Sequence, residues 1–469
     1  MRGFLIYICM VFCAIASVAK AQNFDELIKT YFPSGDYSIA LLDLETGKIV
    51  RTGKARKSLP PASVMKIPTA LYALENLGSN FKFRTRVLIT TSNISDGILK
   101  GDVILAGGGN PTLDTDGLVR MASDLAAFGV RRVEGEFYVY EGALPYQRFL
   151  DPGQLDFVSY NPAISGLNLN FNRVFFEWKA GDGGYELGLS AKTKTYKPTV
   201  RGVKIGIADR KGPVYKFSDS QGVERWSVAR EALGKGGNRW LPVRDPAIYA
   251  GEIFRYYAKQ KGVDLPAAKK LKGAPKGDVI SLDLSATLDR QLRSMLKFST
   301  NLSAETIGMT ASIKAGNKVT KVADSARAMQ VWFGTQTGSA PKLLDHSGLN
   351  VKSRMTAENM VRFLAKADAQ RLIKPLLKEV ELRNAEWKKA PLAGTKIVAK
   401  TGTLNFTSAL AGYIDSASGK RFAFAIFTHD SKRHAAIPKD QRDRATGARS
   451  WARKSRILQH QLLRAWASR

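Results

Sequence analysis

Cysteine is almost absent from this sequence, with only Cys9 and Cys13 among 469 residues. Both lie in the first 21 residues, where a charged start precedes an apolar run over residues 4–18 and a small-residue pattern that ends at Ala21. This order is typical of a secretory signal peptide, and a helix over the apolar run would span about 22 Å, too short for a permanent anchor in a ~30 Å hydrocarbon core. We predict cleavage after Ala21, which removes residues 1–21 and leaves a mature chain without disulfides or thiolate chemistry.

Acidic residues are also scarce, because 41 Asp and Glu face 72 Lys and Arg, for a net charge of +31. A basic excess attracts polyanions at long range without determining a fold. Since a secreted protein does not meet the genome, we predict no nucleic-acid partner. Part of the excess lies in the basic tail, residues 431–469, where a solvated face is the default interpretation and electrostatic contact with an anionic wall or membrane surface is the hypothesis. The sequence does not indicate an oligomeric state.

Histidine is rare as well, with His346, His429, His434 and His460 as the four residues of this type. None belongs to a His-Glu-x-x-His motif, and a zinc site is disfavoured without cysteine. The glycine run at residues 107–111 has neither the Lys-Ser/Thr of a phosphate loop nor dinucleotide spacing, and Asp-His-Ser at residues 345–347 is too compact for a catalytic triad. Both are interpreted as turns, and we predict no metal and no cofactor.

Long apolar runs are missing after the signal peptide, so the mature chain is predicted to be soluble. Its length is about three times a typical ~150-residue domain, and strand and helix periodicities alternate, which predicts a multidomain α/β fold. Strands are predicted at residues 37–47, 83–91, 103–106, 134–141, 396–400, 409–415 and 421–428. Helices are predicted at residues 60–77, 113–128, 246–261, 285–297, 303–315, 322–333, 356–367, 371–378 and 449–466. Residues 172–244 are predicted to form a small β-rich module.

Three short motifs combine residue types that suit nucleophilic catalysis: residues 63–66 (Ser-Val-Met-Lys), 299–301 (Ser-Thr-Asn) and 400–403 (Lys-Thr-Gly-Thr). The first lies at the start of a predicted helix, where Ser63 and Lys66 share one face about 5–6 Å apart at Cβ. A serine hydroxyl needs a neighbouring base, and lysine can serve only if burial or nearby cations lower its pKa. Alone, this pair also occurs by chance on solvated helix faces.

The other two motifs supply groups that would complete such a site. Ser299 and Asn301 offer a hydroxyl that can relay a proton and an amide that can hold a substrate. Lys400 and Thr401 offer a cation and a hydroxyl on a strand, where Gly402 permits close approach of a substrate backbone. Each motif also has a structural interpretation as a cap, a turn or a strand end. In this order, however, the three are the signature of β-lactamases and penicillin-binding proteins.

The surroundings of the motifs resemble the D-alanyl-D-alanine carboxypeptidase/endopeptidase family, the class C low-molecular-mass penicillin-binding proteins, which are serine DD-peptidases. The matching stretches span nearly the whole mature chain and are residues 61–66, 105–113, 299–305, 345–349 and 400–413. The resemblance implies a β-lactamase/transpeptidase-like α/β catalytic domain, with an antiparallel sheet flanked by helices and smaller domains inserted after Ser63. We predict the catalytic domain at residues 22–84 and 280–469, an inserted α/β domain at residues 85–171 and 245–279, and an inserted β-rich domain at residues 172–244.

The resemblance also implies roles for the residues that match the family motifs. Ser63 would be acylated by a peptide that ends in D-Ala-D-Ala, and Lys66 would be its general base. Ser299 and Asn301 would move protons and hold the substrate amide. Lys400 would bind the terminal carboxylate of the substrate.

The remaining implied roles concern substrate binding. Thr401 would bind the terminal carboxylate beside Lys400, Gly402 would lie along the substrate backbone, and the N–H of Thr403 would share the oxyanion hole with that of Ser63. The family usually has an aspartate after the strand near residue 139, where this sequence has Tyr140-Glu141. Glu141 is therefore predicted to take that substrate-binding place, and the preferred diamino residue of the substrate stays open.

The prediction is a periplasmic serine-type carboxypeptidase, with or without endopeptidase action, that acts on peptidoglycan stem peptides. β-Lactam antibiotics would be its inhibitors. Two alternatives stay open at this point: a β-lactamase of related fold, and a catalytically weak wall-binding protein.

Overall fold

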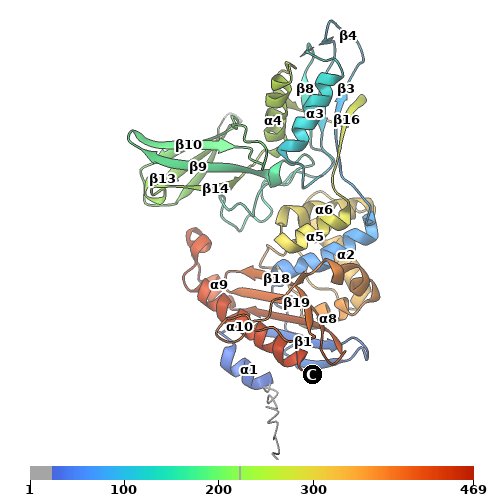
Figure 1. Cartoon of the computed structure of the whole chain (residues 1–469), viewed down its shortest axis with the longest axis vertical. Coiled ribbons are helices and arrows are strands. Elements are labelled where there is room, and N and C mark those ends of the chain that lie inside the picture. The colour runs from blue at the N-terminus through green and yellow to red at the C-terminus, as the bar shows by residue number, and fades with distance from the viewer. Residues whose placement is uncertain (1–23, 221–222) are drawn as a thin grey trace, which may run out of the picture.

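A computed structural model describes residues 24–220 and 223–469, so the predicted signal peptide lies outside the described residues (Figure 1). A six-stranded antiparallel sheet brings the two ends of this part of the chain together. Its order is β17 (Lys378–Glu379), β18 (Lys396–Leu404), β19 (Thr407–Asp415), β20 (Arg421–His429), β1 (Asp36–Asp43) and β2 (Ile49–Gly53). The pairing of β1 with β20 runs from Asp36 opposite His429 to Asp43 opposite Phe422. The segment between β2 and β17 therefore leaves this sheet and returns to it.

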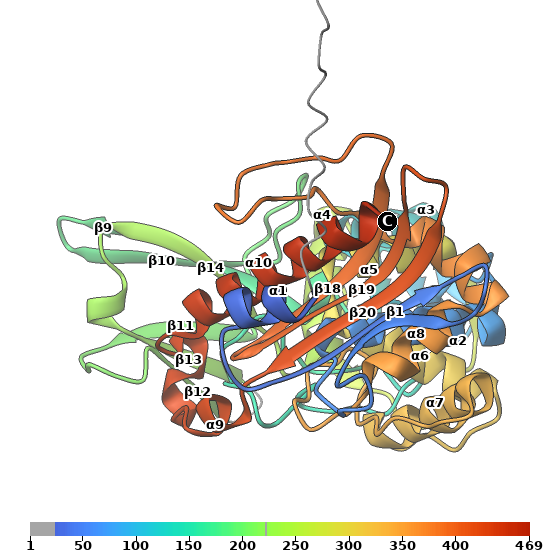
Figure 2. The ribbon, with the colours of Figure 1, turned by 90° about the horizontal axis from the view of Figure 1, so that it is seen from below.

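Helices cover both faces of the six-stranded sheet (Figure 2). On β19, Leu410 and Ile414 pack with α1 (Phe24–Tyr31) and α10 (Ala448–Ala467), while Ala411 and Tyr413 belong to the core on the other side. Side chains alternate between the two faces of a strand, so a strand covered on both sides is apolar at nearly every position. This explains why residues 407–414 are all buried.

The inner face of the sheet packs against a helical layer. Its members are α2 (Lys66–Leu77), α5 (Leu288–Phe298), α6 (Asn301–Lys314), α7 (Val322–Thr337) and α8 (Ala357–Leu364). The predicted helix at residues 371–378 is wrong, because residues 369–373 form a single wide turn and residues 374–376 a tight one before β17 begins. Pro375 has no backbone N–H to donate, which interrupts the hydrogen bonds that would continue an α-helix, although Lys374 itself keeps helical angles.

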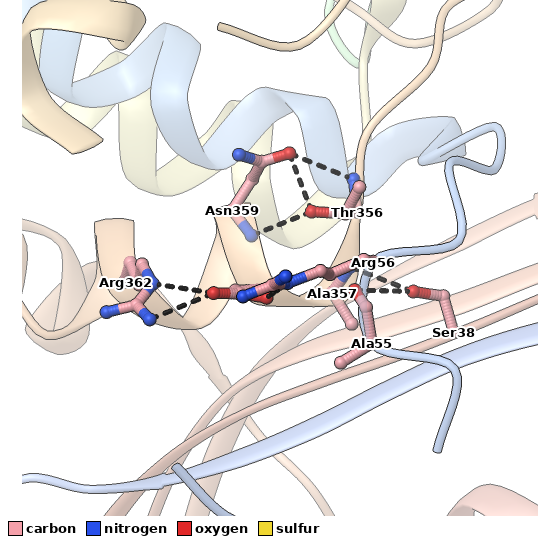
Figure 3. A network of polar contacts seen from close by, with 8 residues as sticks. Ser38, Ala55, Arg56, Thr356, Ala357, Asn359 and Arg362 are labelled. Atoms are coloured by element: carbon pink, nitrogen blue, oxygen red, sulfur yellow. Dashed lines mark hydrogen bonds and ion pairs between the residues drawn. The ribbon is translucent and has the colours of Figure 1, made fainter. Parts of the chain in front are cut away.

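The start of α8 is tied to the sheet by a polar network (Figure 3). The hydroxyl of Ser38 on β1 accepts from the N–H of Ala357 at 3.0 Å and donates to the carbonyl of Ala55 at 3.1 Å. Thr356 Oγ1 accepts from the N–H of Asn359 at 2.9 Å, and Asn359 Oδ1 accepts from the N–H of Thr356 at 3.2 Å. This reciprocal pair is a capping box, which satisfies N–H groups that the first turn of a helix leaves without partners.

Three further sheets and one small ribbon lie in the segment between β1 and β20. The five-stranded sheet has the order β15 (Ala268–Lys270), β8 (Phe137–Tyr140), β6 (Val103–Ala106), β3 (Arg84–Ile89) and β16 (Asp278–Leu284), and it packs on α3 (Thr115–Ala127) and α4 (Pro246–Gln260). Two three-stranded sheets consist of β9 (Arg173–Gly181), β10 (Gly184–Ser190) and β14 (Gly236–Pro242), and of β11 (Val203–Ala208), β12 (Tyr215–Ser220) and β13 (Val223–Ala229). The ribbon contains β4 (Ile94–Ser95), β5 (Ile98–Leu99) and β7 (Arg132–Val133).

These sheets bear on the predicted division of the chain. All the strands of the two three-stranded sheets lie within residues 173–242, inside the segment predicted to be β-rich. The predicted limit at residue 280 falls within β16, which pairs with β3 in the five-stranded sheet as far as Leu284. The domain limits themselves stay a prediction. Within residues 24–220 and 223–469, no helix is both long and apolar enough to cross a membrane.

Candidate active site

Ser63 lies in a single tight turn, Ala62–Met65, that leads directly into α2. Ala62 has a φ of +46°, a conformation that costs a non-glycine residue free energy and is held here by its surroundings. The backbone of β18 presses against this turn at Gly402, where an added Cβ would lie 2.8 Å from the amide nitrogen of Ser63. A glycine at this position therefore allows the strand and the serine to meet.

Lys66 is the first residue of α2 and is completely buried. Its Nζ donates to Ser63 Oγ at 3.0 Å, to Asn301 Oδ1 at 2.8 Å and to the carbonyl of Ser347 at 2.8 Å. An ammonium has three N–H donors, so the three acceptors account for all of them. Burial, followed by the charge of Lys400, lowers the pKa of Lys66 to about 7. Near neutral pH the amine is therefore neutral in much of the population and able to accept a proton from Ser63.

The Ser-Thr-Asn motif joins α5 to α6, as predicted. Ser299 ends α5 in the left-handed conformation, with φ of +59°, and Asn301 is the first residue of α6. Asn301 accepts from Lys66 through Oδ1, and its Nδ2 donates to the carbonyl of Tyr160 at 3.0 Å. The amide therefore links the lysine to the loop that contains Tyr160.

The Lys-Thr-Gly-Thr motif lies on β18. Lys400 is buried, its Nζ donates to the carbonyl of Thr401 at 2.6 Å, and burial lowers its pKa to about 8. Thr401 and Thr403 are exposed, whereas Gly402 between them is buried. In the described chain, β17 pairs with β18 only at Val398 and Ala399, so the edge of residues 400–404 that faces away from β19 is free to pair with an extended peptide.

A cavity of about 790 Å³ opens over these motifs. Ser63, Ser299, Asn301 and Thr403 line it, whereas Lys66 and Lys400 lie behind its wall. The rest of the lining comes from the loop at residues 151–154, Tyr160, residues 348–352, and the chain from Leu404 into α10. Its charged members are four cations and two carboxylates: Lys352, Arg442, Arg449, Arg456, Asp151 and Asp443.

Glu141 is a predicted site residue that does not line the cavity, and the same is true of Lys66, Lys400, Thr401 and Gly402. One oxygen of its carboxylate accepts from Ser165 Oγ at 2.7 Å, and the other is 2.7 Å from Lys270 Nζ. Glu141 follows the end of β8 and is absent from the cavity lining. A carboxylate can accept further hydrogen bonds beyond these two, so a substrate-binding role for Glu141 stays a prediction.

The sequence interpretation missed a buried support behind Lys66. The carboxylate of Glu305 on α6 accepts from the N–H of His346 at 3.0 Å and from the N–H of Ser347 at 2.8 Å. Asp345 accepts from the N–H groups of Gly348 and Asn350. These bonds fix the loop whose Ser347 carbonyl holds Lys66. A signal was present, because Glu305 is an acidic residue in a helix whose neighbouring positions are almost all apolar or small.

The titratable groups of this support are buried away from water, which shifts their pKa values toward the neutral forms. Burial raises the pKa of both Glu305 and Asp345. Burial lowers the pKa of His346 to about 3, and its Nε2 lies 2.7 Å from Ser325 Oγ, so it is a neutral core residue. The described residues contain no group of three or more His, Cys, Asp or Glu side chains that could hold a metal ion.

Comparisons with known proteins agree with this geometry. The model of the D-Ala-D-Ala carboxypeptidase 3 (S13) family matches residues 21–453. The chain is 26% identical over 431 residues to a D-alanyl-D-alanine carboxypeptidase from an Actinomadura species, covering 83% of this chain and 76% of that protein. It is 23% identical over 394 residues to D-alanyl-D-alanine carboxypeptidase DacB of Haemophilus influenzae, covering 78% and 79% of the two chains.

Solved structures show the same fold. The crystal structure of penicillin binding protein 4 from Haemophilus influenzae matches with a TM-score of 0.74 and 19% identity, covering 94% of this chain and 99% of that chain. Its complex with a β-lactam matches with a TM-score of 0.73, 19% identity and the same coverage. The predicted α/β fold of the penicillin-binding proteins is thereby confirmed. Because the family model matches nearly the whole chain, this protein belongs to the D-Ala-D-Ala carboxypeptidase 3 (S13) family and is a hydrolase.

Proposed function

We propose that this protein is a periplasmic serine DD-peptidase that cleaves peptidoglycan stem peptides ending in D-Ala-D-Ala through an acyl-enzyme on Ser63. The observation that carries the proposal is the 3.0 Å hydrogen bond between Lys66 Nζ and Ser63 Oγ, made by a buried lysine whose pKa is lowered to about 7. A lysine in this state is suited to act as a general base at neutral pH. The cavity in front of Ser63 gives a peptide access to the hydroxyl.

In the acylation step, neutral Lys66 takes the proton of Ser63 while Oγ attacks the carbonyl carbon of the penultimate D-Ala. The N–H groups of Ser63 and Thr403 stabilise the oxygen of the tetrahedral intermediate, because preorganised donors act on charge that develops in the transition state. The C–N bond then breaks, and the leaving amine receives a proton through Ser299. Lys66 is thereby restored to neutrality once the relayed proton has left it.

Substrate binding uses the free edge of β18. Lys400 and the hydroxyl of Thr401 hold the terminal carboxylate of the peptide, and the amide of Asn301 holds a substrate amide. Water then attacks the ester carbonyl with Lys66 again as the base, which releases the shortened peptide and regenerates the serine. Cleavage of D-Ala cross-links by the same steps would make the enzyme an endopeptidase, and both activities are included in the proposal.

Labelling with a fluorescent penicillin tests the proposal, since a related structure was solved with a β-lactam bound. The mature protein is expected to form a stable adduct, the Ser63→Ala variant none, and a D-Ala-D-Ala peptide is expected to release D-Ala. Rapid turnover of the penicillin would indicate a β-lactamase instead. An absence of both label and D-Ala release would indicate a wall-binding protein without catalysis.

A further inference from the structure

The five-stranded sheet has one face without a helix. α3 and α4 pack on the face that contains Val87, Val103 and Phe137. Neighbouring side chains in register point to the same side of a sheet. On β3, Arg84 and Arg86 pair with Leu284 and Leu282 of β16, and Arg86 pairs with Ala106 of β6, which pairs with Tyr140 of β8. We call this surface the open sheet face, made of Arg84, Arg86, Tyr138, Tyr140, Leu282 and Leu284.

The open sheet face combines solvent-exposed residues with buried apolar residues. Leu282 and Leu284 are 48% and 46% exposed, Arg84 is exposed, and Tyr138 and Tyr140 are half-buried. On the same face, Leu88, Ile104 and Ala106 are buried in an apolar cluster with the two tyrosines and with Leu271, which begins the segment that connects the edge strands β15 and β16. From β8 to β16 the face spans three strand spacings, or about 14 Å. In Figure 1 the helices α3 and α4 lie on one side of β3 and β16, and the other side has no helix.

The charge of this surface is unbalanced. Lys82, Arg84 and Arg86 occupy alternate positions of an extended segment, so their side chains share one side. Together with Leu284 they line a cavity of about 620 Å³ that contains no carboxylate. Within the described part of the chain, none of the three cations has a carboxylate oxygen within 4 Å. Unpaired cations beside tyrosine rings and aliphatic side chains suit a ligand with carboxylates and sugar or peptide surfaces.

We propose that the open sheet face binds the peptidoglycan polymer at a distance from the catalytic serine, with carboxylates of the stem peptides on Arg84 and Arg86 and the strand laid across the tyrosines. The inference rests on the proposed function, because it takes the substrate to be an anionic polymer. None of the residues of the face lines the cavity over Ser63. Binding here holds the enzyme on an insoluble substrate without altering the chemistry at Ser63.

The test is co-sedimentation with purified insoluble peptidoglycan, in a Ser63→Ala background so that the polymer stays intact. Replacing both arginines, Arg84→Gln with Arg86→Gln, is expected to weaken binding roughly tenfold, since each exposed contact contributes modestly. The matched control is Lys204→Gln with Arg225→Gln, two exposed cations paired across β11 and β13, which removes the same charge elsewhere. Equal binding by the arginine variant and the control variant would overturn the proposal. Arginine-dependent binding to phosphatidylglycerol vesicles but not to peptidoglycan would also overturn it.

A second measurement separates this inference from the proposed function. With Ser63 intact, the arginine variant is expected to release D-Ala from a short soluble peptide at the parent rate but to digest the insoluble polymer more slowly. A parent enzyme that releases no D-Ala would contradict the proposed function while the sedimentation result still stands. A loss of soluble-peptide activity in the arginine variant would show an effect on the active site and would contradict the inference.

Discussion

At the scale of single residues, the site depends on removing a lysine from water. Lys66 has hydrogen bonds to Ser63, Asn301 and Ser347, and among the residues that the structure describes no carboxylate bonds to it directly. Desolvation favours the neutral amine, and the nearby charge of Lys400 acts in the same direction. The site therefore contains a base that is available at neutral pH, and this property is measurable.

The acylation rate should report the protonation of Lys66. Because the neutral amine of Lys66 is the active form and its pKa is about 7, the second-order rate of penicillin acylation is expected to rise with pH through about 7. It should fall again above about pH 8, where Lys400 loses the charge proposed to hold the carboxylate. Lys66→Ala should lower the maximum of this profile by ~10²–10⁴-fold. Stopped-flow fluorescence across a pH series measures both. A parent-like rate in Lys66→Ala would refute the general-base role.

Glu305 is expected to act as a positioning residue. Glu305→Ala leaves two buried N–H groups without an acceptor, which should lower the free energy of unfolding by about 2–5 kcal/mol. Acylation should slow as well, because the loop that presents the Ser347 carbonyl to Lys66 loses its anchor. Glu305→Gln keeps one acceptor oxygen and should recover part of both losses. Urea unfolding and labelling kinetics check this, and an Ala variant with parent stability and parent kinetics would contradict it.

At the scale of elements, the site forms where a strand and a turn touch. β18 approaches the turn of Ser63 at Gly402, and its edge beyond Ala399 is free of β17. A free strand edge is normally protected because it pairs with other chains. Here the exposed segment is short, and Thr403 and Leu404 line the cavity, so the proposed substrate peptide would pair with the edge there.

Gly402→Ala tests this contact. The new Cβ would lie 2.8 Å from the nitrogen of Ser63, so the turn or the strand must move. A displacement of about 1 Å in a catalytic group is expected to lower acylation roughly 10²-fold. Labelling kinetics with fluorescent penicillin measure the loss. Parent-like acylation in this variant would show that the contact does not position Ser63.

The cap of α8 provides a contrasting prediction at the same scale. Thr356→Ala removes the hydroxyl that accepts from the N–H of Asn359, and should lower the free energy of unfolding by about 1 kcal/mol. Acylation should stay at the parent rate, because neither residue lines the cavity. Urea unfolding and labelling are measured on the same preparation. A large kinetic effect would mean that α8 contributes to the site.

At the scale of the whole molecule, part of the basic excess lies around the cavity over Ser63. Four of the six charged residues of the cavity lining are cations, and three of these lie at Arg442, Arg449 and Arg456, near the end of the chain. The basic tail is thus partly a wall of the cavity, a role that its composition did not predict. A positive surface around a cleft raises the encounter rate of anions and is screened by salt.

Raising the salt concentration should therefore lower kcat/KM more for an anionic peptide than for a neutralised one. For a D-Ala-D-Ala peptide with free side-chain carboxylates, kcat/KM is expected to fall roughly two- to tenfold when the ionic strength rises tenfold. For the same peptide with its side-chain carboxylates amidated, kcat/KM should change little, because salt screens only the electrostatic attraction of those carboxylates. Steady-state release of D-Ala measures both peptides. Equal salt dependence of the two would exclude a contribution of the basic surface to substrate capture.

The sequence by itself determined the local features: the strands of alternating or continuous apolar residues, most helices, and the three motifs with their order. Each depends on neighbours within a few positions, where backbone geometry and side-chain periodicity decide the outcome. The predicted helix at residues 371–378 was wrong for a local reason, Pro375. The substrate-binding role of Glu141 stays a prediction, and the sequence did not indicate that Lys270 and Ser165 bind its carboxylate.

Only the tertiary structure decided the chemistry of the site. Ser63, Asn301, Ser347 and Gly402 are far apart in the sequence and meet because β1 and β20 close the sheet around the long segment between them. The shift in the pKa of Lys66 arises from this assembly, since desolvation depends on every group that excludes water and no motif contains that information. The motifs thus named the candidate reacting groups, and the packing of distant segments lowered the pKa of Lys66, the proposed general base.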